Sequence, residues 1–360
     1  MMDSNDRTPA VTSGWRWGRF AQMGFGLAVS VLCLWLALRD LAVDAVLRSL
    51  RQAELTWVAL ALLSVVFTNG AKAARWRLLF FPHHRHLPTR SLFAILLAGQ
   101  AVSLAIPLRG GELARAYLVG QRFGDSKART LATVGVEKVI DLAMLALCIL
   151  LLAPLLVSTD AAALTSRRSS LVSVALLLLT GAIIGLLGRH HWVTLARRLA
   201  GRLPNQAGAR WIGLLDAALH GLDALRYPAV VIRVIAWSVL TWLLAGSTNY
   251  LVLRALHLPA DAVVSFTLLA VLQAGISVPS SPGKIGVFQF LCQLTLAWFG
   301  MAAVHGFAVG VLLYAVAPLS LMIAGGFALL WQSWQLRREM PAAAAAPRSG
   351  EPQNPGEAQI

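Results

Sequence analysis

Three groups of charged or polar residues lie inside apolar stretches of the sequence. An ionisable side chain at the centre of a membrane helix costs about 2.5–3.5 kcal/mol on insertion, so we expect each group to have a partner or a function that offsets this cost. The first group is Arg109, Glu112 and Arg115, beside Gly110 and Gly111, which let the backbone approach a ligand closely. Glu112 and Arg115 are three residues apart and can pair on one helix face. The arginines and the free N–H groups of a helix start also suit a phosphate or carboxylate. The alternative is a salt bridge that only closes the local fold.

The second group is Glu137, Lys138 and Asp141. Glu137 and Asp141 are four residues apart and share a helix face, and Lys138 can neutralise Asp141. This spacing is compatible with a proton or cation site, or with counter-charges for Arg109 and Arg115. A packed intramembrane ion network without a ligand is the other interpretation.

The third group is a polar break in an apolar run. Its members are Ser280, Ser281, Pro282, Gly283, Lys284 and Gly286. Lys284 could hold a lipid phosphate, or it could be the snorkelling lysine of a bent helix. The Walker A pattern is absent, so ATP hydrolysis is unsupported. We expect no catalytic residue, metal or cofactor from the motifs present.

The composition indicates which elements must position these groups. The chain is 58% hydrophobic and 13% charged, against about a quarter charged in a soluble domain. The net charge is +15, which fits either a nucleic acid or an anionic membrane surface. Because the basic residues lie between long apolar runs, we expect membrane lipids as partners and no nucleic acid.

The apolar runs predict an all-α polytopic membrane protein. A helix needs about 20 apolar residues to cross the hydrocarbon core. Six segments meet this requirement, namely 19–38, 55–74, 130–156, 171–188, 229–253 and 304–332. Segments 91–122 and 262–300 are instead broken by proline and glycine at Pro107–Arg115 and Pro279–Gly286, and we expect each to be a re-entrant hairpin. Eight full spans are the alternative.

The distribution of basic residues favours the hairpins. With a cytoplasmic N-terminus, 20 of the 31 Lys and Arg residues fall in cytoplasmic segments, as the positive-inside rule requires. The order span, span, hairpin, span then occurs twice, in 19–156 and inverted in 171–332, a plan that many secondary transporters share. Both termini are then cytoplasmic.

The remaining segments have simpler predicted roles. Residues 1–18 form the N-terminus, 157–170 an outer loop and 333–360 a disordered tail. Segment 189–228 has the spacing of amphipathic helices on the cytoplasmic leaflet. The polar end of the second span, from Asn69 to Arg77, is interpreted as an anchor at the membrane interface.

Three motifs together resemble a known family. They are Pro107-x-x-Gly110-Gly111-Glu112-x-x-Arg115-x-Tyr117, Val136-Glu137-Lys138-x-x-Asp141, and Pro279-Ser280-Ser281-Pro282-Gly283-x-Ile285-Gly286-Val287. They are similar to the flippase-like transmembrane domain of lysylphosphatidylglycerol synthases, which also occurs as stand-alone proteins of bacterial and archaeal membranes. The resemblance covers about 20–332. It implies a multi-pass protein of the bacterial cytoplasmic (inner) membrane with lipid substrates, and it adds Tyr117 to the candidate site.

The sequence departs from the family in three places. Lys138 stands where arginine is common, Lys284 where glycine is common, and Phe288-Gln289 where an acidic residue is common. Only a short segment follows residue 332, so the resemblance does not imply lysyl transfer.

Three functions stay open. The first is a flippase for a phospholipid or lipid-linked precursor, with anionic or phosphate-bearing headgroups. The second is a lipid-modifying transferase that uses Glu112 or Asp141 as base. The third is a scaffold for a separately encoded lipid synthase or glycosyltransferase.

Overall fold

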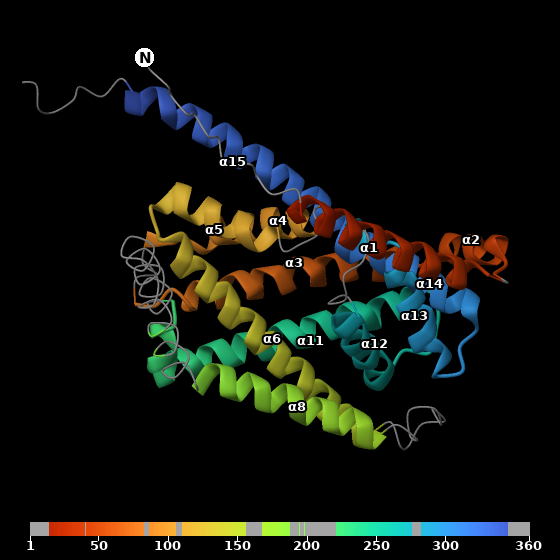
Figure 1. The fold of residues 1–360 in the computed structure, drawn as a ribbon. Coiled ribbons are helices and arrows are strands. Elements are labelled where there is room, and N and C mark those ends of the chain that lie inside the picture. The colour runs from red at the N-terminus through yellow and green to blue at the C-terminus, as the bar shows by residue number, and fades with distance from the viewer. Residues whose placement is uncertain are drawn as a thin grey trace, which may run out of the picture.

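The apolar segments of the sequence fold into long helices that lie roughly side by side (Figure 1). A computed structural model describes residues 14–39, 41–82, 86–105, 110–155, 168–187, 221–275 and 282–344, with Thr194 and Arg198. No strand occurs among these residues. Backbone groups in lipid must be satisfied within the chain, and helices do this locally. The predicted all-α class is therefore confirmed.

Four helical segments are long and apolar enough to cross a membrane. They are α3 (Leu55–Leu78), α6 (Lys127–Leu155), α11 (Pro228–Ala255) and Ala303–Gln332. The last one comprises α14 (Ala303–Tyr314), the π-helix η5 (Ala315–Leu319) and the first part of α15 (Ser320–Ala344). Two further helices, α1 (Gly14–Leu38) and α8 (Arg168–Leu187), are also apolar.

The first Pro/Gly break separates two helices that fold back on one another. Helices α4 (Thr89–Ala105) and α5 (Gly110–Phe123) pack together, with Gly99 against both Gly111 and Arg115. A Cβ atom at Gly111 would overlap the carbonyl oxygen of Gly99 and the hydroxyl of Ser103. Gly111 thus permits close helix packing, a common use of small residues in membranes.

The second break has the same form. Helix α12 (Ala262–Gly275) is followed along the chain by the short η4 (Pro282–Lys284) and by α13 (Val287–Ala297). Gly275 lies against Leu291, so α12 and α13 also fold back on each other. Gly283, Lys284 and Gly286 have φ values of +78°, +58° and +90°, a left-handed backbone that a lysine adopts at a cost. Both interrupted segments are therefore helical hairpins.

Helices α3 and α11 form the antiparallel centre of the bundle. At one end the N–H of Glu54 donates to the carbonyl of Ala255, and at the other Arg75 contacts Ser238. The hairpin helix α4 packs on α3 and α15, while α12 packs on α11 and α6. The turn η4 contacts α4, so the second hairpin reaches the first.

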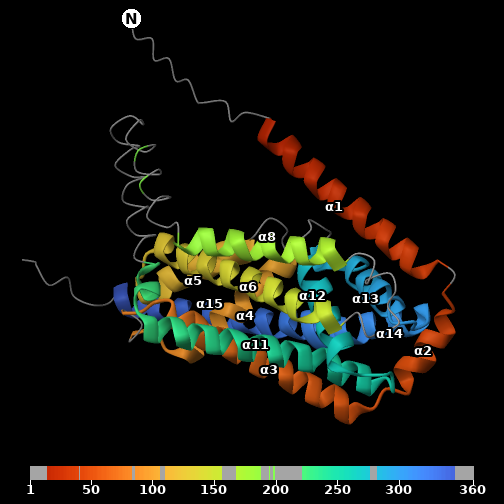
Figure 2. The same cartoon turned by 90° about the horizontal axis from the view of Figure 1, so that it is seen from below.

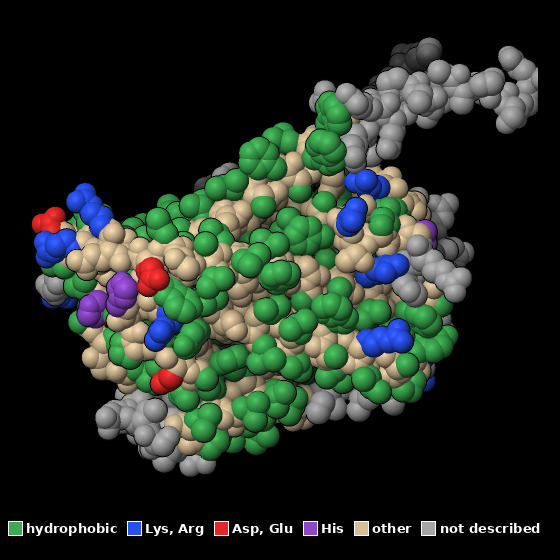
Figure 3. Space-filling view, turned by 180° about the vertical axis from the view of Figure 1, so that it is seen from behind, with side chains coloured by type: hydrophobic (Ala, Val, Ile, Leu, Met, Phe, Trp, Pro, Cys, Tyr) green, Lys and Arg blue, Asp and Glu red, His purple; other side chains and the backbone are tan. Residues whose placement is uncertain are grey.

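Hydrophobic side chains cover the middle of the molecule, and charged ones gather at its two ends (Figure 3). Leu177, Phe327 and Leu330 are 72%, 68% and 68% exposed. Apolar side chains at this exposure are expected where lipid, rather than water, surrounds the protein. The apolar surface in the middle of the molecule thus agrees with a membrane environment.

Several elements differ from the sequence-based expectations. Helix α2 (Val43–Arg51) follows α1 at an angle of 85° and was not predicted, and α1 diverges from the bundle toward its N-terminus (Figure 2). Counting α1 and α2 as one bent span would give five candidate spans, against the six expected. Helix α15 continues to Ala344, beyond the expected boundary at 332. Most of the amphipathic segment 189–228 lies outside the described residues.

Candidate functional site

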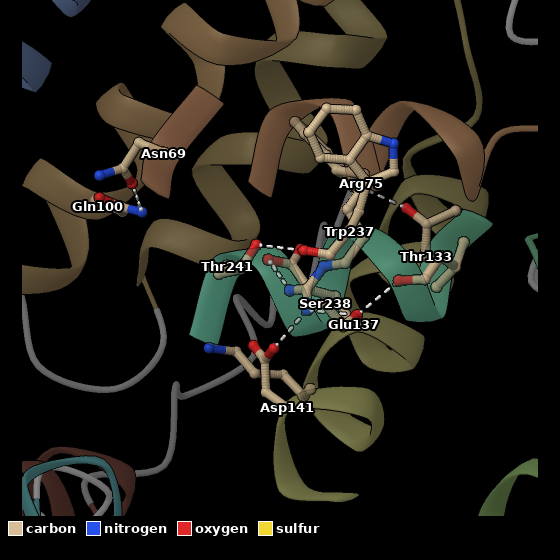
Figure 4. A network of polar contacts seen from close by, with 12 residues as sticks. Asn69, Arg75, Gln100, Thr133, Glu137, Asp141, Trp237, Ser238 and Thr241 are labelled. Carbon is tan, nitrogen blue, oxygen red and sulfur yellow. Dashed lines mark hydrogen bonds and ion pairs between the residues drawn. The ribbon is translucent and has the colours of Figure 1, made fainter. Parts of the chain in front are cut away.

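A buried arginine of α3 is the centre of an ionic network between three helices (Figure 4). Arg75 has no exposed surface. Its Nη1 atom lies 2.7 Å from Oδ1 of Asp141 and donates to Oγ of Ser238 at 3.2 Å. Its Nη2 atom lies 3.4 Å from Oε1 of Glu137. The planar guanidinium fork can satisfy these acceptors at once, so α3, α6 and α11 are joined at one point.

The first hairpin is attached to the same network through Arg115. Its Nη2 atom lies 2.6 Å from Oε2 of Glu137, and its guanidinium lies 3.9 Å from the centre of the Trp76 ring. The indole N–H of Trp76 donates to the hydroxyl of Thr133 at 3.1 Å, which fixes the ring. Glu137 thus bridges Arg75 and Arg115, and both arginines are neutralised by carboxylates.

Three lysines lie around this network. Lys138 lies 4.0 Å from Glu112, and its side chain is 61% exposed. Lys72, one helical turn before Arg75, is within electrostatic range of Asp141, Glu137 and Lys138, but it forms no ion pair with another described residue. Lys284 of η4 is within electrostatic range of Lys138. Counting only the residues that the structure describes here, five basic side chains lie beside three acidic ones, an excess of two positive charges.

The network lies well inside the bundle. Lys138 comes eleven residues after the start of α6, which is about 16 Å along the helix axis at 1.5 Å per residue. Ser238 comes ten residues after the start of α11, which gives about 15 Å. Arg75 and Lys72 come three and six residues before the end of α3, so the network is enclosed by the helices but lies toward one end of the central helix pair.

Two contacts hold the turn that carries Lys284. The hydroxyl of Tyr314 donates to the carbonyl of Gly283 at 2.7 Å, immediately before the π-helix η5. The side chain of Gln289 accepts a hydrogen bond from the N–H of Gly286 at 2.8 Å and so caps α13. The left-handed conformation of Lys284 is therefore supported from both sides.

The structure brings most of the expected site residues together but changes their pairing. Glu112 and Arg115 do not pair with each other, because Arg115 points inward to Glu137 while Glu112 faces Lys138. The expected neutralisation of Asp141 by Lys138 is also wrong, since Arg75 takes that role. Glu137 does act as the counter-charge of Arg115, which was one of the interpretations left open.

Other expected site residues lie apart or have another role. Tyr117 is on the exposed face of α5, where its hydroxyl accepts a hydrogen bond from Gln121 at 2.7 Å and its ring lies 5.0 Å from the Lys127 ammonium. Gly111 contacts α4 rather than an open space. Arg109, Ser280 and Ser281 lie outside the described residues.

Sequence reasoning missed Lys72 and Arg75. Both were assigned to an interfacial anchor because they stand near the end of a predicted span. Arg75 and Trp76 are fully buried, which contradicts an anchoring role. The available signal was the spacing of Lys72 and Arg75, three residues apart in an otherwise apolar helix, which puts both charges on one face.

Comparison with known proteins agrees with the motifs on these hairpins. Residues 23–335 match the family described as the lysylphosphatidylglycerol synthase TM region. The chain belongs to this family. The resemblance seen in the three motifs is thereby confirmed, and the chain is an integral membrane protein of a lipid-related family. No curated protein and no solved structure matched the chain.

Proposed function

We propose that this member of the family moves the headgroup of a phospholipid or lipid-linked precursor across the cytoplasmic membrane. The observation that carries the proposal is the excess of positive charge between the helices, beside the contact of η4 with α4. Arg75 and Arg115 are already bound to carboxylates. Lys72 and Lys138 are the groups that can bind an anion, and Lys284 lies within electrostatic range of Lys138.

The positive charges of the lysines require a compensating negative charge. A charged side chain within the membrane costs several kcal/mol unless a counter-charge or water offsets the cost. Glu112 compensates Lys138 weakly at 4.0 Å. A phosphate placed among the three lysines would supply the missing negative charge, while its acyl chains stayed in the surrounding lipid. An anionic headgroup is thus the ligand that the charge balance favours.

The carboxylates favour transport over group transfer. A general base needs a free carboxylate within reach of the proton that it removes. Asp141 is bound to Arg75 at 2.7 Å, and Glu137 is bound to both arginines. Two of the three acidic groups therefore stabilise the fold, and one partly exposed carboxylate, Glu112, is left for chemistry.

We also propose that both hairpins are re-entrant and that the two halves of the chain form an inverted repeat. The packing pairs support this symmetry. Contacts of α3 with α4, α5 with α6, and α4 with α15 have counterparts in α11 with α12, α13 with α14, and α12 with α6. The charges do not follow the symmetry, because Phe288 and Cys292 of α13 pack in an apolar core. A single headgroup site, built mainly from the first half and completed by Lys284 of the second, is the expected consequence.

Reconstitution into vesicles tests the proposal. The wild-type protein should accelerate the transbilayer movement of labelled phosphatidylglycerol, and Lys138→Gln should reduce this rate by about tenfold, the effect of losing one charge-assisted contact. Lys127→Gln is the matched control, since it removes the same charge at the exposed start of the same helix. Movement no faster than in protein-free vesicles would reject transport and favour the scaffold function.

A further inference from the structure

A pocket of about 270 Å³ lies at the opposite end of the central helix pair from the Arg75–Ser238 contact. Glu54 and Trp57 at the start of α3 line it, together with Arg254, His257 and Leu258 at the end of α11. Trp57 and Lys72 are fifteen residues apart on α3, or about 22 Å along the axis. The pocket is therefore separate from the lysine site.

The walls of this pocket are fixed by the backbone and by an aromatic contact. The N–H of Glu54 donates to the carbonyl of Ala255 at 2.9 Å, which joins the two helix ends. The guanidinium of Arg254 lies 5.4 Å from the centre of the Trp57 ring. His257 has a φ of +56° because it is the left-handed residue of the cap that ends α11, where the N–H of Leu258 donates to the carbonyl of Leu253 at 3.0 Å. This cap fixes His257 and Leu258 in the pocket wall.

The charges of the pocket are complementary but separate. Arg254 and Glu54 have opposite charges and line the same space, yet neither forms an ion pair within the described part of the chain. Two opposite charges that face one cavity without touching can be bridged by a ligand that carries both signs. Tryptophan beside arginine is also typical of the headgroup level of a membrane.

We infer that this pocket binds the headgroup of a zwitterionic phospholipid with a primary amine. Arg254 contacts the phosphate, and the carboxylate of Glu54 accepts hydrogen bonds from the ammonium. A quaternary ammonium has no N–H to donate, so an ethanolamine headgroup fits better than a choline one. The pocket has no excess charge when His257 is neutral, unlike the lysine site with its excess of two. The two sites therefore select different headgroups, and this inference does not depend on transport.

Native mass spectrometry of the delipidated full-length protein, titrated with phosphatidylethanolamine, tests the inference. Arg254→Gln and Glu54→Gln should each raise the Kd of the most tightly bound phosphatidylethanolamine molecule about tenfold, because each substitution removes a charge-assisted contact. Arg48→Gln is the control, since Arg48 is exposed on α2 and does not line the pocket. Equal binding by Arg254→Gln and Arg48→Gln would overturn the assignment.

Three further binding measurements test which part of the lipid the pocket recognises and whether the two sites are separate. Phosphatidylcholine should bind more weakly than phosphatidylethanolamine, and equal binding would refute recognition of a primary amine. Glycerophosphoethanolamine, which lacks acyl chains, should also bind more weakly, and equal binding would refute a lipid occupant. Lys138→Gln should weaken phosphatidylglycerol binding but leave phosphatidylethanolamine binding unchanged, so failure of the proposed transport site is distinguished from failure of the pocket.

Discussion

Nη2 of Arg115 lies 2.6 Å from Oε2 of Glu137, so the returning helix of the first hairpin is held to α6 by a buried charge pair. The same carboxylate reaches Arg75 of α3 through its other oxygen. A single glutamate therefore joins three elements that are far apart in the sequence. The stability of the bundle and the geometry of the adjacent lysines both depend on it.

Glu137→Gln tests this role. The substitution leaves Arg115 buried without a counter-charge, and breaking a buried pair from one side costs about 3–5 kcal/mol. The free energy of unfolding, measured by denaturant titration in detergent micelles, should fall by about that amount. Glu112→Gln should cost less than about 1 kcal/mol, because its pair with Lys138 is long and partly exposed. Equal losses in the two variants would contradict the bridging role of Glu137.

Arg75→Lys tests whether the fork geometry matters. A lysine keeps the charge but cannot donate in one plane to Asp141, Ser238 and Glu137 together. We expect unfolding to become easier by about 2 kcal/mol, the value of a hydrogen bond to a charged group. Arg226→Lys, whose partner Asp223 is near the surface, should have almost no effect. An unchanged stability in Arg75→Lys would show that charge alone is sufficient.

The sequence could predict the two hairpins because their cause is local. Proline and glycine interrupt apolar runs, and the helices end where the backbone can no longer continue the hydrogen-bond ladder. The partners of the charges could not be predicted in the same way. Arg75 meets Asp141 across 66 residues of chain, and the local alternative of Lys138 with Asp141 has an equally good spacing. Only the packing of α3 against α6 and α11 decides between them.

Gly111→Ala tests the close approach of the hairpin helices. Its methyl group would overlap backbone and side-chain atoms of α4, so the helices must separate. Overpacking of this kind costs about 1–3 kcal/mol, and we expect a matching loss in the free energy of unfolding. Gly135→Ala is the control, because a Cβ there meets no atom within 4 Å and alanine favours the helix. A similar result for both variants would refute the packing role of Gly111.

Tyr314→Phe tests the support of the second break. The substitution removes the hydrogen bond to Gly283 but keeps the aromatic ring, whose centre lies 5.5 Å from the centre of the Phe288 ring. The turn that carries Lys284 should loosen, with a loss of about 1 kcal/mol in stability and slower lipid movement in vesicles. Tyr250→Phe should change neither quantity, since Tyr250 forms no hydrogen bond with another described residue. Unchanged lipid movement in Tyr314→Phe would show that this support of the turn is not needed for transport.

Helix α2 and the glycine contacts show a second limit of sequence reasoning. The segment Val43–Arg51 alternates apolar and basic residues at helical spacing, so a surface helix could have been predicted from it. Gly111 was instead interpreted as a point of close ligand approach. A glycine permits close contact with either a ligand or another helix, and the sequence does not say which one is present.

The central claim is that Lys72, Lys138 and Lys284 hold a lipid phosphate between the helices of the bundle. A phospholipid with a photoreactive group in its headgroup, reconstituted with the protein and activated by light, tests this directly by peptide mapping. The account predicts adducts near Lys138 of α6 and at Pro282–Gly286, which disappear in the combined variant Lys72→Gln, Lys138→Gln, Lys284→Gln. Adducts confined to lipid-facing residues such as Leu177 and Phe327, and unchanged in that variant, would contradict it.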